Sequence, residues 1–257
     1  MGTKAEEKFA LITRNLQEVI SEDELRDVLK KNKEPSVYWG TATTGSVSLA
    51  YFFPMMKVAD FLEAGLKVKI LLADLHAAMD STPWEELDKR TAYYEKAIVT
   101  ILETIGVSTK KLEFVRGRDL QRDTNYLMDV LKLSTFSSVH DANKAASEVV
   151  KLGDNPKLSG ILYPLMQALD EEYLKVDMQF GGMDQRKIFV FAREYLPKIG
   201  YKPRVELMNP MIRGLAGEKM SSSDGNSKID LMDDEKTVQK KINKAECVEG
   251  EPDNGIM

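Results

Sequence analysis

Three short segments carry residue types that can bind a charged substrate. The first is residues 38–51, which read Tyr-Trp-Gly-Thr-Ala-Thr-Thr-Gly-Ser-Val-Ser-Leu-Ala-Tyr. An apolar run enters a turn of small and hydroxyl residues, and a helical pattern follows. Backbone amides at a helix start suit a phosphate, and Thr43 and Thr44 can add hydroxyl donors. A capped turn without a ligand explains the same residues, and the segment lacks the spacing of a Walker loop or a dinucleotide fingerprint.

The second segment is residues 217–225, Gly-Glu-Lys-Met-Ser-Ser-Ser-Asp-Gly. Its lysine, Lys219, lies in a loop with three serines and two glycines. A lysine in such a loop can reach a polyphosphate, because its long side chain carries a point charge. A flexible polar loop without a ligand is the alternative interpretation.

The third segment is residues 163–185. Tyr163, Gln167 and Asp170 are spaced four and three apart, so they share one face of a helix. If that face is buried, its polar groups need hydrogen-bond partners, and if it is exposed it is an ordinary helix surface. A pair of glycines follows at the end of a predicted strand, flanked by Gln179, Asp184 and Gln185. This is a place where a ribose or an amide can be held.

The elements that must position these segments alternate along the chain. Apolar runs predict buried strands at 37–40, 68–73, 176–180 and 205–208. Helical spacing of apolar residues predicts helices at 9–20 and 21–29, before Gly65, at 85–105, over 118–150 with a break near residue 137, at 159–173, at 184–199 and after about 227. Ser21 and Glu24 have the spacing of a capping box. Alternation of strands and helices favours a doubly wound α/β sheet, which binds ligands at the carboxyl ends of its strands.

Composition narrows the classes further. The chain has 257 residues, of which 43% are hydrophobic and 30% charged, so a disordered or collagen-like chain is excluded. One cysteine and two histidines exclude a disulfide framework and a cysteine-built metal site, and we expect no metal site. The net charge of −5 does not drive the whole chain onto nucleic acid. Because no signal peptide or membrane-spanning run is present, we expect a cytoplasmic protein without membrane contact.

Taken together, the segments resemble the catalytic domain of tyrosyl-tRNA synthetases of the eukaryotic and archaeal type. The string from Lys219 to Ser223 matches the KMSKS signature of class I synthetases. Strings that look like tyrosine-family blocks occur in the right order at 38–40, 73–77, 163–170 and 181–186. The resemblance extends from about residue 4 to the end and implies a Rossmann-like parallel sheet with a helical insertion and N-terminal helices.

The resemblance also implies roles for individual residues. The phenol of a tyrosine substrate would be bound by Tyr38 and Asp170, and its ammonium group by Tyr163, Gln167 and Gln185. Two further members of the tyrosine pocket would be Asp74 and Gln179. The ATP-binding positions would be Gly40, Thr43, Ser48, Gly182, Asp184, Lys219 and Met220. The catalytic contacts to the phosphates would come from Lys219, Ser221, Ser222, Thr43, Thr44 and Ser48.

One position departs from the family pattern. The HIGH signature falls on residues 48–51, and Ser48 stands where a histidine is expected. A serine hydroxyl is shorter and carries no charge. Either Thr43, Thr44 and Lys219 suffice for the phosphates, or adenylate formation is slow.

The implied reaction uses ATP with Mg²⁺ as a substrate complex, without a prosthetic group, and passes the tyrosyl group to tRNA(Tyr). The alternatives are a tryptophanyl-tRNA synthetase, a tRNA-binding or signalling module without catalysis, and an oxidoreductase, which the missing dinucleotide fingerprint disfavours. The implied regions are N-terminal helices at 1–35, a catalytic domain at 36–210 whose insertion at about 80–160 forms a homodimer, and the KMSKS loop with the start of a helical region at 211–257. Since 34 residues follow Ser223, we expect a fragment without the anticodon-binding domain that forms tyrosyl-adenylate but charges tRNA poorly.

Overall fold

The computed structural model describes residues 4–150, 153–215, 225 and 227–250. The strands are β1 (Glu18–Ile20), β2 (Ser36–Thr41), β3 (Lys67–Leu72), β4 (Leu112–Arg116), β5 (Met178–Gly182) and β6 (Val205–Asn209). The α-helices are α1 (Lys4–Thr13), α2 (Glu22–Lys31), α3 (Phe52–Glu63), α4 (Asp74–Met79), α5 (Leu87–Ile105), α6 (Gly117–Gln121), α7 (Thr124–Ser134), α8 (Val139–Ala146), α9 (Leu158–Tyr173), α10 (Arg186–Tyr195) and α11 (Glu235–Asn243). Short 3-10 helices are η1 (Leu49–Tyr51), η2 (Trp84–Glu86), η3 (Met183–Gln185) and η4 (Leu196–Ile199).

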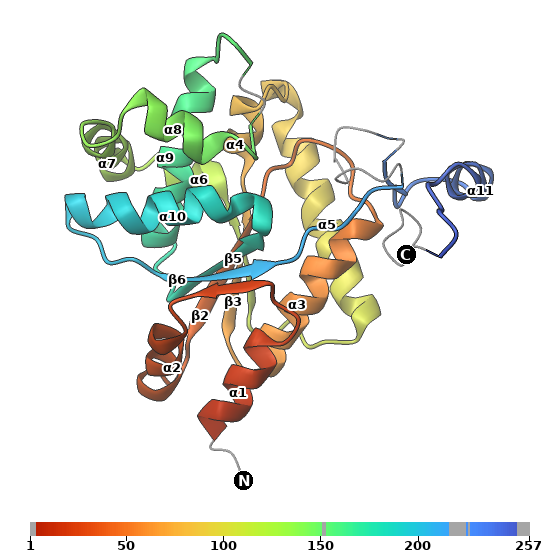
Figure 1. The fold of residues 1–257 in the computed structure, drawn as a ribbon, viewed down its shortest axis with the longest axis horizontal. Coiled ribbons are helices and arrows are strands. Elements are labelled where there is room, and N and C mark those ends of the chain that lie inside the picture. Colours follow the sequence, from red (N-terminus) through yellow and green to blue (C-terminus); the bar gives the residue numbers. More distant parts are fainter. Residues whose placement is uncertain (1–3, 151–152, 216–224, 226, 251–257) are drawn as a thin grey trace.

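The six strands form one sheet in the order β1-β6-β5-β2-β3-β4 (Figure 1). All neighbouring strands run parallel except β1, which pairs antiparallel with β6. The chain winds from β2 outward to β4 and then returns to β5 on the other side of β2. The order therefore reverses between β2 and β5, which is the point where open α/β sheets bind ligands.

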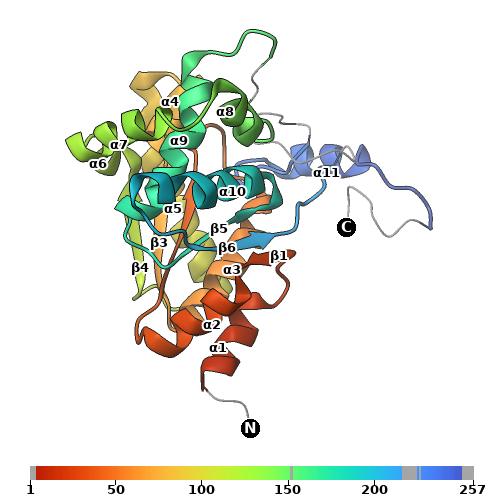
Figure 2. The ribbon, with the colours of Figure 1, turned by 60° about the vertical axis from the view of Figure 1, so that its left-hand side comes forward.

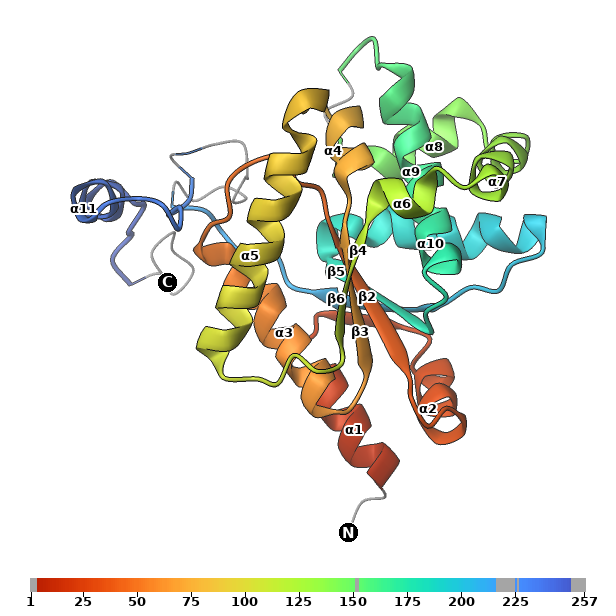
Figure 3. The same cartoon turned by 180° about the vertical axis from the view of Figure 1, so that it is seen from behind.

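Helices cover both faces of this sheet. One face packs its apolar side chains against α3 and α5, as seen from behind in Figure 3. The helices α7–α10 gather at the opposite face and form a second apolar cluster among themselves (Figure 2). Helix α11 lies apart from that group in the views of Figures 1 and 3. Among the helices of the described ranges, none has the length and apolar character that a bilayer crossing needs.

The interior strands β2, β3, β5 and β6 confirm the sequence prediction, because strands buried on both faces read as continuous apolar runs. The helix predicted over 9–20 is wrong beyond Thr13. Asn15 has a φ of 60°, which ends the helix, and Gln17 N–H then donates to Met208 O (2.8 Å) to start β1. The capping box is also wrong, since Ser21 is left-handed (φ 71°) and its side chain makes no cap hydrogen bond.

Both edge strands lie inside ranges that sequence analysis assigned to helices. β1 belongs to residues 1–35, and β4 belongs to the range 80–160. That range is therefore not wholly helical, because it contributes one strand to the central sheet. β4 is short, and its side chains are mostly half-buried, so its apolar pattern is weak.

A buried lysine fastens α1 to α3. Lys57 is 4% exposed, and its Nζ pairs with Asp60 (2.7 Å). The same ammonium group donates to the carbonyl oxygens of Ile12 (3.2 Å) and Arg14 (2.5 Å), at the end of α1. It thereby satisfies carbonyls that a helix end leaves without partners.

We expect Lys57→Met to lower the free energy of unfolding by about 2 kcal/mol, because helix-end carbonyls and the buried Asp60 carboxylate lose a charged hydrogen-bond partner, while Arg14 still pairs with Asp60. Urea denaturation followed by circular dichroism measures this value. Lys31→Met is the matched control, since Lys31 forms an exposed pair with Asp27 and should cost less than about 0.5 kcal/mol. Equal losses in the two variants would contradict this role of Lys57.

Candidate functional site

A cavity of about 370 Å³ opens at the carboxyl ends of β2 and β5. The turn after β2 and the Gly181-Gly182 end of β5 form two of its walls, and α9 supplies a third. It therefore lies at the reversal of strand order, where the connections after β2 and β5 lead in opposite directions.

Ten of the residues expected to bind substrate line this cavity. They are Tyr38, Gly40, Thr44, Tyr163, Gln167, Asp170, Gln179, Gly182, Asp184 and Gln185. The structure thus brings together residues from two segments far apart in the sequence, 38–44 and 163–185. Four further predicted residues, Lys219, Met220, Ser221 and Ser222, lie outside the described residues.

Three predicted residues lie away from the cavity wall. Asp74 is fully buried, and its carboxylate accepts hydrogen bonds from Arg118 N (2.8 Å) and Arg118 Nε (2.5 Å), which joins α4 to α6. Thr43 is fully buried outside the cavity. Ser48 is 4% exposed and forms an isolated bridge with Asp230. Their expected contacts to substrate find no support in these positions.

The inner end of the cavity holds a carboxylate in a dense hydrogen-bond network. Asp170 is 1% exposed, and its Oδ1 accepts from Gln121 Nε2 (2.8 Å) and from the Tyr126 hydroxyl (2.9 Å). Burial raises the pKa of Asp170 to about 7, and the two hydrogen bonds act in the opposite direction. His76 lies beside it, and burial lowers the pKa of this imidazole to about 4, so it is neutral at pH 7.

Tyr38 stands at the same end of the cavity. Its hydroxyl donates to Oε1 of Gln179, and both side chains are almost fully buried. Burial is the main reason that the pKa of Tyr38 lies well above 10, followed by the charge of Asp170. Tyr38 and Asp170 therefore offer a neutral hydroxyl and a carboxyl group to one end of the cavity.

The polar face of α9 points into the cavity, as its spacing predicted. The Tyr163 ring packs edge-on against His76, with ring centroids 4.5 Å apart. Gln167 Nε2 donates to Gln185 Oε1 (2.9 Å), which links α9 to the turn after β5. These groups form a polar wall between the inner end and the mouth.

The turn after β2 differs from the amide cradle that the sequence suggested. Gly45 N–H donates to the Tyr94 hydroxyl (3.2 Å), and Val47 N–H donates to the Tyr93 hydroxyl (3.3 Å). Leu49 N–H donates to Ile229 O (3.0 Å). Because these three amides already have acceptors within the protein, they are not available as a phosphate cradle.

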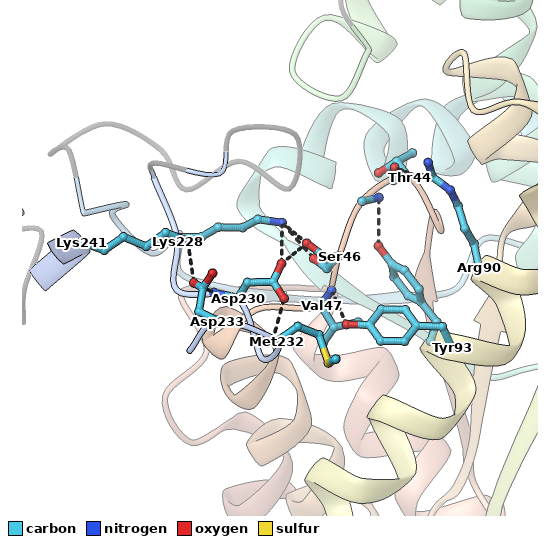
Figure 4. Close-up of polar contacts among 12 residues, drawn as sticks. Thr44, Ser46, Val47, Arg90, Tyr93, Lys228, Asp230, Met232, Asp233 and Lys241 are labelled. Atoms are coloured by element: carbon cyan, nitrogen blue, oxygen red, sulfur yellow. Dashed lines mark hydrogen bonds and ion pairs between the residues drawn. The ribbon is translucent and has the colours of Figure 1, made fainter. Parts of the chain in front are cut away.

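A second polar layer holds the turn from the side of the C-terminal segment (Figure 4). Lys228 Nζ donates to Ser46 O (2.9 Å) and Oγ (3.1 Å). The Ser46 hydroxyl donates to Asp230, while Arg90 from α5 donates to Thr44 O. The turn after β2 is therefore held between α5 and residues 228–230.

Gly182 allows a close approach of the backbone at the mouth. A Cβ atom there would lie 2.6 Å from Asp184 Oδ1 and 3.4 Å from Met211 Sδ. At Gly40 a Cβ would make only ordinary contacts of 3.6 Å or more. Because Asp184 Oδ1 is the end of a side chain that can move, the steric need for glycine is weak at Gly182, and Gly40 shows none.

The charge of the cavity wall is negative. Its charged side chains within the described part of the chain are Asp80, Asp170 and Asp184, and none is a lysine or an arginine. A polyphosphate bound at the mouth would therefore need cationic charge from outside this wall.

Sequence reasoning missed three residues that shape the inner end, namely His76, Gln121 and Tyr126. His76 was present in the 73–77 string, but the role went to Asp74. On a helix those two residues point in different directions, because two positions correspond to about 200° of rotation. Gln121 and Tyr126 come from α6 and α7, and only the tertiary fold brings them to Asp170.

Comparison with known proteins agrees with this geometry. Residues 30–256 match the family described as "tRNA synthetases class I (W and Y)". Tyrosine--tRNA ligase, cytoplasmic, of Gallus gallus is 58% identical over 98% of this chain and 48% of its own length. The Saccharomyces cerevisiae protein of the same name is 54% identical over 98% of this chain and 65% of its own length. The chain spans about half the length of the first of these curated relatives.

Solved structures agree in fold. Tyrosyl-tRNA synthetase from Archaeoglobus fulgidus, crystallised with L-tyrosine, is 38% identical with a TM-score of 0.89, over 98% of this chain and 78% of that chain. Tyrosyl-tRNA synthetase from Leishmania major, in complex with tyrosinol, is 29% identical with a TM-score of 0.85, over 96% of this chain and 47% of that chain. With a family match over most of its residues, the chain belongs to the class I tRNA synthetase family of the tryptophan and tyrosine (W and Y) enzymes.

Proposed function

We propose that this chain activates L-tyrosine with ATP to form tyrosyl-adenylate, and that the whole protein passes the tyrosyl group to tRNA(Tyr). The observation that carries the proposal is the pairing of Tyr38 and Asp170 at the inner end of the cavity. A substrate phenol can hydrogen-bond there, while Gln121 and Tyr126 hold the carboxyl group in place. The high identity to proteins named tyrosine--tRNA ligase supports the same assignment.

The rest of the cavity suits the other substrate groups. The face of α9 with Tyr163 and Gln167, together with Gln185, offers polar partners for the ammonium group of the amino acid. Gly182 and Asp184 at the mouth suit the ribose of ATP, because both line the cavity and the Asp184 carboxylate can accept hydrogen bonds from ribose hydroxyls. ATP would enter as its Mg²⁺ complex, with the metal belonging to the substrate.

In the proposed reaction, the carboxylate of tyrosine attacks the α-phosphate of ATP and pyrophosphate leaves. No general base is needed, because an α-carboxyl group is ionised at neutral pH. The protein contributes alignment of the two substrates and stabilisation of charge on the phosphates. Lys219 would supply protein cationic charge to the phosphates, since the described wall of the cavity carries none.

Specificity follows from the buried polar groups. Phenylalanine would leave Tyr38 and Asp170 without a ligand hydroxyl in a closed pocket, and unsatisfied buried groups are costly. Tryptophan would place an indole against the same pair. The pocket therefore favours a phenol over both alternatives.

Pyrophosphate exchange tests the proposal. We expect exchange to depend on tyrosine, with tryptophan and phenylalanine giving little signal. Exchange that depends on tryptophan would identify the other branch of the family. Absence of exchange with any amino acid would favour a binding module.

Relatives named cytoplasmic support a cytoplasmic location for this protein. Its partners in the proposal are tyrosine, ATP and tRNA(Tyr), together with a second copy of the chain. The apolar surface of α7 supports that last partner. Four large side chains on α7 or just after it are about half exposed, namely Leu127, Met128, Leu131 and Phe136. Helical spacing places Leu127 and Leu131 on one face, so they can pack against a symmetric copy.

We expect Leu131→Glu to convert a dimer into a monomer, because a charge at the centre of an apolar interface loses its hydration. Size-exclusion chromatography with light scattering should give twice the chain mass of 29.0 kDa for the wild type and the single mass for the variant. Met232→Glu is the control, since Met232 is 77% exposed near α11 and should leave the dimer intact. A monomeric wild type, or a dimeric Leu131→Glu, would contradict this interface.

A further inference from the structure

The segment that precedes α11 pairs with the turn that follows β2. Leu49 N–H donates to Ile229 O (3.0 Å), and Leu231 N–H donates to Val47 O (3.1 Å). The pairing between these two bonds is antiparallel. Two segments from opposite ends of the chain thus form a short two-stranded contact.

A buried lysine lies beside this pairing (Figure 4). Lys228 is 3% exposed, and its Nζ donates to Ser46 O (2.9 Å) and to Ser46 Oγ (3.1 Å). Asp230 accepts the Ser46 hydroxyl, and its Oδ2 lies 3.9 Å from Lys228 Nζ. An ammonium group is costly to bury unless acceptors and an opposite charge surround it. Lys228 therefore depends on Ser46 and Asp230, and it fastens the two segments to each other.

Helix α5 holds the same turn from the other side. Arg90 donates to Thr44 O, and the hydroxyl groups of Tyr93 and Tyr94 accept two backbone N–H groups of the turn. The buried face of α5 is itself packed on the sheet. The position of residues 44–47 therefore depends on contacts from both sides.

The turn carries one wall of the cavity. Thr44 lines the cavity and lies two residues before Ser46, whereas Lys228 is not among the described residues of the wall. Lys228 thus reaches the cavity through the turn and not by a contact of its own. The inner end of the cavity has different support, because α6 and α7 hold Asp170 there. A displaced turn should therefore disturb the mouth and leave the inner end as it is.

We propose that Lys228 is a positioning residue, which binds Ser46 and so holds residues 44–47 where adenylate formation needs them. The rate of reaction between two bound groups depends steeply on their alignment, and a turn that moves at the mouth would misalign ATP with the bound amino acid. The inference rests on the proposed function for the reaction. The contact between Lys228 and the turn can be tested without it.

Hydrogen exchange of the turn tests the contact itself. Peptides that span residues 44–51 report the amides of Gly45, Val47 and Leu49, each of which has an acceptor within the protein. We expect Lys228→Met to speed their exchange about tenfold, the effect of losing about one hydrogen bond to a charged group. Unchanged exchange would overturn the proposal, whatever the activity of the protein.

Single-turnover kinetics test the consequence for the reaction. Stopped flow with saturating tyrosine and ATP should show that the rate constant of adenylate formation falls about 10–100-fold in Lys228→Met. The Kd of tyrosine, measured by calorimetry, should not change, because the inner end keeps its support. A first-order rate constant does not depend on the fraction of folded protein, so a general loss of stability does not lower it. A loss of tyrosine affinity as large as the loss of rate would contradict a role at the mouth.

Ser46→Ala is a milder change to the same contact. It removes the hydroxyl group that Lys228 and Asp230 share but keeps the carbonyl group, so the protein should fold. Exchange of the turn and the rate constant should both change in the same direction as in Lys228→Met, by a smaller factor. Wild-type values in both measurements would argue against the contact.

Lys57→Met is the matched control. Lys57 is 4% exposed and also donates to main-chain carbonyl groups, but these belong to the end of α1. The variant should lose stability while the exchange over residues 44–51 and the rate constant keep their wild-type values. A loss of rate equal to that in Lys228→Met would refute a specific role of Lys228. Failure of the proposed function would appear as absence of adenylate in the wild type, whereas failure of this inference would appear as unchanged exchange in Lys228→Met.

Discussion

Lys219→Ala is expected to slow tyrosine-dependent pyrophosphate exchange by about 10²–10³-fold in kcat, the usual effect of losing one group that stabilises transition-state charge. The described wall of the cavity carries three aspartates and neither lysine nor arginine. The negative charge that develops on the phosphates must therefore be met by Mg²⁺ and by a cation from elsewhere. Lys219 is the residue that the KMSKS resemblance assigns to this task.

The affinity for tyrosine should change little in this variant, because the residues proposed to bind the amino acid line the inner part of the cavity and do not include Lys219. Calorimetry with tyrosine alone checks this point, and stopped-flow measurement of adenylate formation checks the rate. Lys240→Ala removes the same charge from an exposed position of α11 and should leave both values unchanged. Equal losses in tyrosine affinity and rate for Lys219→Ala would refute a phosphate role.

For Asp170→Ala we expect the preference for tyrosine over phenylalanine to fall about 100-fold. A hydrogen bond to a charged group contributes about 1.5–3 kcal/mol, and about 2.7 kcal/mol corresponds to that factor. The variant also removes one acceptor each from Gln121 Nε2 and the Tyr126 hydroxyl, which keep His76 Nδ1 (3.2 Å) and Met166 O (2.6 Å) as partners. Tyrosine should therefore lose affinity while phenylalanine loses less. The measurement is kcat/KM for pyrophosphate exchange with each amino acid.

Asp129→Asn separates this effect from a general loss of stability. Asp129 is also buried and accepts the hydroxyls of Tyr173 (2.7 Å) and Tyr201, but it does not line the cavity. The control should lower the unfolding temperature and leave the tyrosine preference unchanged. The assignment of Asp170 fails if its substitution changes stability and not the preference.

The predictability of the fold depended on where each strand lies. β2, β3, β5 and β6 were visible as apolar runs because both faces of a central parallel strand are covered. β1 and β4 are edge strands, and their residues follow no such run. Val19 and Ile20 even match helical spacing, but the left-handed Asn15 and the pairing with β6 decide for a strand. The local spacing of apolar residues contains no information about a strand partner that is almost 190 residues away in the sequence.

The candidate site divides in the same way. The spacing of Tyr163, Gln167 and Asp170 placed one polar face on α9, and the structure directs that face into the cavity. Asp74 was expected in the pocket, but its carboxylate accepts a hydrogen bond from Arg118, and His76 lines the cavity wall instead. Two residues of one short helix differ in direction, and the packing of α4 on α6 decides which of them faces inward.

By itself the sequence determined the chemical groups of this protein: two tyrosines, three aspartates and three glutamines in or beside predicted strands and helices, and a lysine-serine loop. The tertiary structure decided how those groups are used. The register of β2, β5 and β6 aligns Tyr38, Gln179 and Glu206. Helix α9 adds Glu171, which accepts a hydrogen bond from Gln179. The direction of each hydrogen bond in that row depends on all four partners at once, because a buried donor must meet an acceptor. No spacing along a single segment encodes that condition.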